Sequence, residues 1–212
     1  MVNEEEKFVS RFADGEYSQI NRGGHGCLIY RLRYHGLDSV LKAGKVGSRS
    51  DLEVLTNIDG YREMREKGID DLISPKIYFQ DEYGGYVALV TEYVGEDLIH
   101  SANESTISFS MKVLEDVLRK VYEKTIKHSP SESKEWVKRI KGRIDRCFCK
   151  HFNNKGLVTP FEIDKVCAMS IPSTDYVAWA TADLKLDNIC ISEQRGVRII
   201  DPKCNSSGDT HY

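Results

Sequence analysis

The sequence has no apolar stretch that approaches the roughly 18–20 residues of a membrane-spanning helix. Its first ten residues, MVNEEEKFVS, are acidic and lack the apolar core of a secretory signal peptide. The chain also has no internal repeat and no low-complexity segment. These absences predict a soluble, cytoplasmic protein, unless a specialised export machinery reads a signal of another kind.

The six cysteines show neither a C-x-x-C spacing nor a pattern of paired cysteine and histidine ligands. Such spacings are typical of zinc sites and disulfide frameworks, so neither kind of site is expected. We expect the cysteines to be buried or free thiols in a reducing compartment.

Net charge is small, at −3, but the charges are unevenly distributed. Residues 119–150 hold eleven lysines and arginines against four acids, a local excess of +7 that leaves −10 for the remainder. A basic face can attract acidic partners, or it can be an ordinary solvated helix surface. With 212 residues, of which 40% are hydrophobic, the chain can bury a core in one domain or in two small lobes.

The first half of the sequence is typical of antiparallel strands. Segments 27–34 and 39–43 are separated by HGLD, which predicts a hairpin. Residues 76–94 predict two further strands around a Gly-Gly turn.

One helix is predicted between these hairpins. Ser50 and Glu53 form a capping-box pattern at its start, and apolar residues continue at helical spacing. Gly60 and Gly68 weaken the pattern and leave the end of the helix uncertain.

The second half is mostly helical. Apolar residues at helical spacing predict helices over 109–126, 136–148 and 160–169, and Pro130 separates the first two. Three strand-like segments follow, YVAWA (176–180), NICIS (188–192) and VRIID (197–201).

These patterns predict an α+β protein of two parts. Residues 1–94 form a small lobe of strands and one helix, and residues 95–212 form a mostly helical lobe that ends in strands. The boundary is expected near Val94.

Two acids and an amide stand around the last two strand-like segments. Asp183 lies five residues before Asn188, and Asp201 ends the final strand. In phosphoryl transfer, the first aspartate of such an arrangement orients the attacking hydroxyl and accepts its proton. The asparagine and the second aspartate supply the hard oxygen ligands that Mg²⁺ prefers. The pattern predicts a phosphotransferase; the alternative is that these residues simply form turns.

The stretches ADLKLDNICI and VRIID resemble the catalytic loop and metal-binding strand of the protein-kinase-like superfamily, which includes aminoglycoside phosphotransferases. The resemblance implies that Asp183 is the catalytic aspartate and that Asn188 and Asp201 are metal ligands. Pro202 and Lys203 replace the last two residues of the D-F-G motif, and the Asp-Pro form is familiar from the small-molecule branch. The implied fold is bilobal α+β, with a small antiparallel N-lobe sheet and a reduced, mostly helical C-lobe, and the implied cofactors are ATP and Mg²⁺.

An upstream stretch, INRGGHGCL, resembles the kinase phosphate-covering loop G-x-G-x-x-G. Asn21 stands at the first glycine position, Gly23 and Gly26 stand at the other two, and Gly24 is additional. Lys42 follows sixteen residues after Gly26 in SVLK, which resembles the V-A-I-K strand and implies a contact with the α- and β-phosphates. The alternatives are an ordinary glycine turn and a strand-end lysine.

A kinase lysine of this type is held by a carboxylate of the following helix. Glu63 lies twelve residues before Pro75 and suits the family's spacing between helix and strand, so it is the favoured partner of Lys42. Glu53 is the other candidate, although a capping role already accounts for it.

The stretch ALVTEYVGEDL resembles the kinase hinge. Thr91 would be the gatekeeper, and backbone groups of Glu92 and Val94 would face adenine. The resemblance covers roughly residues 18–98 and 176–203, in which the motifs follow the family's order.

The sequence departs from the family in two ways. Thr181 and Ala182 replace the usual histidine and arginine, which argues against switching by activation-loop phosphorylation. Eleven residues follow Asp201, too few for a full activation segment and an A-P-E motif. We therefore expect a minimal, constitutively active kinase.

Lys185 gives the D-L-K form that resembles Ser/Thr protein kinases, in which this lysine contacts the transferred phosphate; it favours a protein hydroxyl as acceptor. Size, truncation and motif order also resemble the minimal kinases that bacteria inject into host cells, including the HopBF effectors. That resemblance implies a host protein such as the HSP90 chaperone as substrate, and delivery without a classical signal peptide. A monomer without nucleic-acid or membrane partners is expected.

Two alternatives stay open. A small-molecule, aminoglycoside-type phosphotransferase is favoured by the Asp-Pro pair at 201–202 and by the acidic remainder of the chain. A pseudokinase that acts as a binding module is permitted by the substitutions at Thr181 and Ala182.

Overall fold

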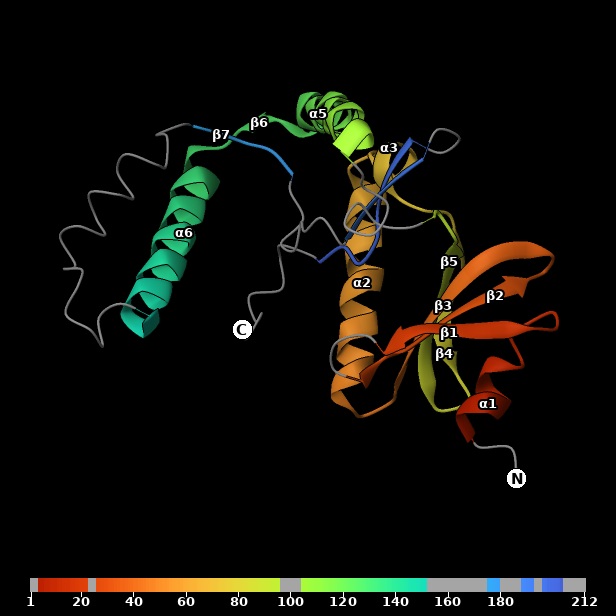
Figure 1. Ribbon diagram of the computed structural model, residues 1–212. Coiled ribbons are helices and arrows are strands. Elements are labelled where there is room, and N and C mark those ends of the chain that lie inside the picture. Colours follow the sequence, from red (N-terminus) through yellow and green to blue (C-terminus); the bar gives the residue numbers. More distant parts are fainter. Residues whose placement is uncertain are drawn as a thin grey trace. The chain divides into compact units, whose positions relative to one another are not determined.

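The computed structural model describes residues 4–22, 26–95, 104–151, 175–179, 188–192 and 196–203 (Figure 1). Contacts divide the chain into two compact units, Met1–Lys124 with Ala180–Tyr212, and Thr125–Trp179. These units do not coincide with the two lobes expected from the sequence. The lobe boundary near Val94 stays a prediction. In the described ranges, no helix combines the length and the apolar character that crossing a bilayer requires.

A five-stranded antiparallel sheet organises the first unit, in the order β1-β2-β3-β5-β4. β3 lies in the middle, where Lys42 pairs with Ile29 of β2 and Leu89 of β5. Both predicted hairpins are confirmed, and β1 adds an edge strand beyond the predicted segments. The strands are β1 (Tyr17–Arg22), β2 (Leu28–Tyr34), β3 (Leu37–Lys45), β4 (Ile77–Tyr83) and β5 (Tyr86–Glu92).

The two hairpins close through residues in the left-handed backbone region. Gly84 and Gly85 have φ values of 59° and 81°, and His35 and Gly36 have values of 50° and 76°. Two consecutive positive φ values are the requirement of the tight turn that matches strand twist, which is why glycine stands at three of the four positions.

One face of the sheet packs against helix α1 (Glu4–Val9). Because successive residues of a strand point to opposite faces, Leu41 and Ala43 of β3 enter this core together with Phe8 and Val9, and Lys42 points to the other face. The acidic N-terminal stretch thus contains a helix that its composition did not predict.

Helix α2 (Arg49–Glu66) packs on that other face, against β3 and β5 (Figure 1). Its N-cap is Ser48, whose side chain accepts a hydrogen bond from the Ser50 amide, so the predicted cap at Ser50 is wrong by two residues. The helix continues through Gly60. Beyond its end Gly68, with a φ of 65°, donates its N–H to the carbonyl of Arg65 at 2.9 Å.

The hairpin formed by β8 (Ile189–Ser192) and β9 (Gly196–Ile199) confirms the two predicted strands. It packs through Ile189 and Val197 on Leu114 of α5 (Glu104–Thr125), the predicted helix over 109–126. The Arg198 guanidinium also donates to the carbonyl of Leu72 in α3 (Asp70–Ile73) at 3.3 Å. These contacts hold the hairpin, and therefore the residues at its ends, within the first unit.

The second unit contains α6 (Pro130–His151) and a short pair of strands, β6 (Lys127–His128) and β7 (Tyr176–Val177). Pro130 is the first residue of α6, a position at which proline is favoured, so it separates the helices as predicted. The predicted helix over 136–148 lies inside α6, and the one over 160–169 lies outside the described residues.

Candidate functional site

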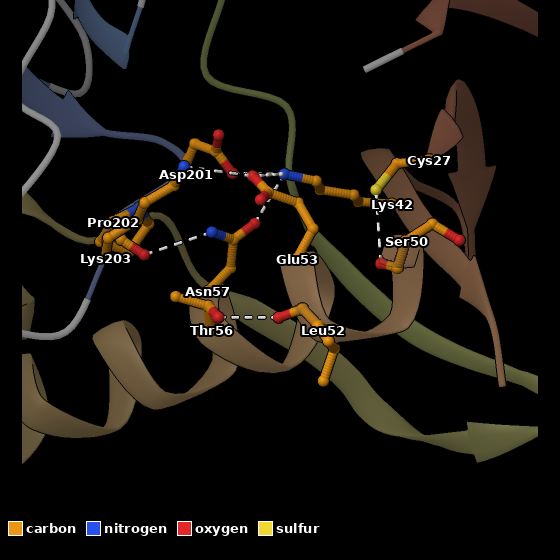
Figure 2. A network of polar contacts seen from close by, with 10 residues as sticks. All are labelled: Cys27, Lys42, Ser50, Leu52, Glu53, Thr56, Asn57, Asp201, Pro202 and Lys203. Atoms are coloured by element: carbon orange, nitrogen blue, oxygen red, sulfur yellow. Dashed lines mark hydrogen bonds and ion pairs between the residues drawn. The ribbon is translucent and has the colours of Figure 1, made fainter. Parts of the chain in front are cut away.

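The middle strand β3 directs the Lys42 side chain toward helix α2, where it is 14% exposed. Its ammonium group forms an ion pair with Asp201 (Figure 2). Lys42 is not part of the apolar core on the other face of the sheet. The two residues are 159 positions apart in sequence. The structure therefore brings together the predicted phosphate-binding lysine and the predicted metal-binding aspartate.

A glycine in β3 lets the first turn of α2 approach the strand closely. A Cβ atom at Gly44 would lie 2.2 Å from the carbonyl carbon of Ser50, so this position tolerates no side chain without a shift. The Ser50 hydroxyl accepts a hydrogen bond from the Lys45 amide at 3.1 Å. The close contact places the next turn of α2, which carries Glu53, within reach of Lys42.

Glu53 provides the helix carboxylate of the site. One of its oxygens lies 3.6 Å from the Lys42 ammonium and 3.5 Å from the Lys203 ammonium. The structure therefore corrects the preference for Glu63, which lies 3.9 Å from Lys67 one turn further along the helix. Ten residues of α-helix span about 15 Å, so two carboxylates at this spacing cannot occupy the same place beside β3.

The β8–β9 hairpin positions the predicted metal ligands. Ile200 donates its N–H to the carbonyl of Asn188 at 2.9 Å, which places Asn188 and Asp201 at the same end of the hairpin. Asn188 is buried, and Asp201 is partly buried with a φ of 58°. A positive φ is uncommon for a residue other than glycine and is frequent at functional sites.

Two further residues of α2 belong to the site although no motif marks them. The side chain of Asn57 accepts a hydrogen bond from Lys42 and donates one to the carbonyl of Pro202. A Cβ atom at Gly60 would lie 2.6 Å from that same carbonyl oxygen. Two features of the sequence could have indicated these residues: Asn57 is a polar residue on the buried side of the predicted helix, and Gly60 is a glycine inside it.

Two titratable groups border the charged cluster. Burial strongly raises the pKa of the Tyr61 hydroxyl, the negative charge of Asp201 adds to this rise, and a backbone hydrogen bond with Asp201 opposes it. Burial also raises the pKa of the Cys27 thiol, while the charge of Lys42 acts in the opposite direction. Both groups are therefore neutral at pH 7 and add no charge to the site.

The phosphate-covering loop is described only in part. Asn21 lies near the end of β1, where its backbone pairs with Ile29, and Gly26 has a φ of 80°. Gly23 and Gly24 lie outside the described residues. Their predicted contact with phosphate stays a prediction.

The predicted hinge stretch begins inside β5 and continues past its last residue, Glu92. Thr91 and Val94 are buried, and Glu92 donates its backbone N–H to the carbonyl of Lys76 at 2.8 Å. Asp183 and Lys185, the predicted catalytic residues, lie outside the described residues, and their roles stay predictions.

The donors at the site fit a magnesium nucleotide. Asn188 and Asp201 offer hard oxygen atoms, and Lys42 offers a positive charge for phosphate. Among the described residues, no three or more histidines, cysteines, aspartates or glutamates are grouped as a metal cage. Mg²⁺ is usually bound by one or two protein ligands together with phosphate oxygens and water, so a pair of ligands is sufficient.

No protein-family model matches the chain, and no curated protein matches it in sequence. Solved structures do match. An aminoglycoside-3'-phosphotransferase of type VIII has 17% identity and a TM-score of 0.55 over 92% of this chain and 73% of its own. A protein described as a fructosamine-3-kinase, from Haemophilus somnus 129PT, has 12% identity and a TM-score of 0.54 over 90% and 66%. A thermostable mutant of aminoglycoside phosphotransferase APH(4)-Ia in its apo form has 10% identity and a TM-score of 0.56 over 88% and 66%.

At these identities the likeness concerns the fold. The chain spans about two thirds to three quarters of the length of the three structures. All three are named for the transfer of a phosphoryl group to a small molecule. The α+β architecture predicted from the sequence is confirmed.

Proposed function

We propose that this chain, which has the protein-kinase-like fold, is an ATP- and Mg²⁺-dependent phosphotransferase. The observation that carries the proposal is the ion pair between Lys42 and Asp201, with Asn188 at the same end of the hairpin. These three residue types at one place are the ones that phosphoryl transfer requires for charge and metal binding. Lys42 and Asp201 lie 159 positions apart in the sequence. The packing of the apolar core does not by itself explain why they form an ion pair.

The residues have distinct roles in this proposal. Lys42 holds the nucleotide phosphates by its positive charge, and Glu53 keeps the Lys42 side chain directed into the site. Asp201 and Asn188 hold the metal, which when bound with ATP offsets the negative charge on the transferred phosphoryl group. Asp183 orients the acceptor hydroxyl and takes its proton, and Lys185 contacts the transferred phosphate. Gly26, with its positive φ, supports a phosphate-covering turn.

For the acceptor, we favour a Ser or Thr hydroxyl of a protein. The D-L-K form at Asp183–Lys185 supports it, because that lysine is typical of Ser/Thr protein kinases. The resemblance to minimal injected kinases extends the proposal to an effector that phosphorylates a host protein such as HSP90, acting as a monomer. A small-molecule acceptor is the second candidate, since the three similar structures are named for such acceptors and Pro202 follows Asp201.

The test is incubation of the full chain with γ-labelled ATP and Mg²⁺. We expect label to be transferred to itself or to a protein in a host-cell lysate, and we expect Asp201→Asn and Asp183→Asn to lower the transfer at least about a hundredfold, since each removes a group required in the transition state. A parallel panel of aminoglycosides and sugar amines separates the two acceptor classes. Nucleotide binding without transfer to any acceptor would favour a pseudokinase, and full activity of Asp201→Asn would end the metal assignment.

A further inference from the structure

Asn57 is a polar residue buried at the centre of the charged cluster, with only 1% of its surface exposed. Its side-chain oxygen accepts a hydrogen bond from the Lys42 ammonium at 2.7 Å. Its side-chain nitrogen donates to the backbone carbonyl of Pro202 at 3.2 Å. One amide of α2 thus contacts both the phosphate-binding lysine and the residue that follows the metal-binding aspartate (Figure 2).

The chemistry of the two partners fixes the orientation of this amide. An ammonium group can only donate a hydrogen bond, and a carbonyl oxygen can only accept one. The Asn57 oxygen must therefore face Lys42, and its nitrogen must face Pro202. Neither aspartate, which has no donor when ionised, nor leucine can make both bonds.

Glu53, one helical turn earlier, repeats the same connection. Its carboxylate lies near both Lys42 and Lys203, so two residues at an i, i+4 spacing each link β3 to the segment 201–203. Gly60 also contributes to the packing of this segment on α2, because the absence of a side chain leaves room for the Pro202 carbonyl.

We propose that Asn57 is a positioning residue that holds Lys42 and the 201–203 segment in a fixed relation to each other. The proposal rests on the proposed function, since it concerns how that site is held for a magnesium nucleotide. The amide suits this role because it is neutral. The charges of Lys42, Glu53, Asp201 and Lys203 already balance, and an amide accepts from Lys42 without cancelling the positive charge that phosphate needs.

The test compares Asn57→Leu, which removes both hydrogen bonds, with Asn57→Asp, which keeps the acceptor and loses the donor. Thr56→Ala is the matched control, because the Thr56 hydroxyl donates to the Leu52 carbonyl of its own helix at 2.7 Å and serves no other element in the cluster. The full chain is used throughout, and urea unfolding selects conditions under which each variant is folded.

The first readout is hydrogen–deuterium exchange of peptides that cover residues 196–203, measured without nucleotide. We expect both Asn57 variants to exchange at least about tenfold faster there than the wild type, while peptides of β2 and β3 keep their protection. A variant that merely weakens the fold would speed exchange in all of these peptides together, and that result would overturn the proposal.

The second readout is the Kd for a fluorescent ATP analogue, with and without Mg²⁺. We expect a loss of at least about tenfold for Asn57→Leu in the presence of Mg²⁺, a larger loss for Asn57→Asp because it adds negative charge, and a change within about twofold for Thr56→Ala. Wild-type affinity in both Asn57 variants would overturn the proposal. If the wild type itself does not bind the analogue, the proposed function fails, and the exchange readout still decides the role of Asn57.

Discussion

Four charged side chains meet at the site although each is largely removed from water. The exposed fractions are 14% for Lys42 and Glu53, 6% for Lys203 and 26% for Asp201. Ion pairs removed from water are a weak source of stability, because desolvation offsets much of the attraction between the charges. Their presence here fits the proposed function, because the binding of phosphate and a metal ion would require charged side chains at this place.

The structure assigns Glu53 rather than Glu63 as the partner of Lys42, and this assignment can be tested by comparing variants of the two glutamates. Glu53→Gln leaves two ammonium groups without their shared carboxylate, so we expect nucleotide affinity to fall at least about tenfold and the free energy of unfolding to fall by about 1.5–3 kcal/mol. Titration with a fluorescent ATP analogue and urea unfolding measure the two effects.

Glu63→Gln is the matched control. Its pair with Lys67, the C-cap residue of α2, joins residues four apart at 3.9 Å, and pairs at this spacing contribute about 0.3–0.5 kcal/mol. We expect nucleotide affinity to change by less than about twofold. A large loss in Glu63→Gln together with a small one in Glu53→Gln would restore the assignment favoured by the sequence.

Helix α2 positions the site through one unusual face. Asn57 lies four residues after Glu53, and Gly60 and Tyr61 lie three and four residues after Asn57, so all four lie along one side of the helix. This side meets β3 and the 201–203 segment through polar groups and a glycine. A search for an apolar stripe therefore finds α2 but not its functional face.

Gly60→Ala should reverse the usual effect of such a substitution. Inside an ordinary helix, replacing glycine with alanine stabilises the protein by about 0.5–1 kcal/mol. Here the new methyl group would lie 2.6 Å from the Pro202 carbonyl oxygen and 2.9 Å from its carbon, which is backbone and cannot turn aside. We expect the free energy of unfolding to fall by about 1–3 kcal/mol in urea, with weaker nucleotide binding.

Asp59→Ala provides the comparison on the preceding residue. Asp59 is 53% exposed and pairs with Arg62 at 2.7 Å, and an exposed pair of this kind contributes at most about 1 kcal/mol. A Gly60→Ala variant that proves more stable than the wild type would show that residue 202 does not pack on α2 as described.

Local signals in the sequence predicted most of the elements. Gly84 and Gly85 mark a turn wherever two strands flank them, and Pro130 marks a helix start, because both effects depend on a few adjacent residues. The cap of α2 was misplaced because Ser48 and Ser50 are both good capping residues two positions apart.

The partners of Lys42 depend on contacts between distant segments. The sequence placed Lys42 and Asp201 in one site through a family resemblance, and the structure joins them. The capping pattern assigned Glu53 another role, and the position of Asn57 on the buried side of the predicted helix does not reveal which groups it contacts. Both assignments required the packing of α2 on β3 and on residues 201–203.

At the scale of the whole molecule, the two ends of the second unit lie side by side, because they form an antiparallel pair of strands. Lys127 pairs with Val177 and His128 with Tyr176, and the Ser129 amide donates to the Asp175 carbonyl at 2.7 Å. Residues 129 and 175 are therefore opposite each other in an antiparallel pair. Among the described residues, neither the buried apolar cluster around Leu41 nor the one around Ile189 contains any of residues 130–174.

This geometry predicts that residues 130–174 can be replaced by the dipeptide Asn-Gly. A two-residue turn of this type closes an antiparallel pair without changing its register, so Ser129 and Asp175 keep their places. Because β3, α2 and the β8–β9 hairpin all belong to the first unit, we expect the shortened chain to unfold cooperatively and to bind a fluorescent ATP analogue within about threefold of the full chain, a change of less than about 1 kcal/mol. A shortened chain that folds but no longer binds the analogue would mean that residues 130–174 contribute to the nucleotide site, and the assignment of that site to the first unit alone would then be wrong.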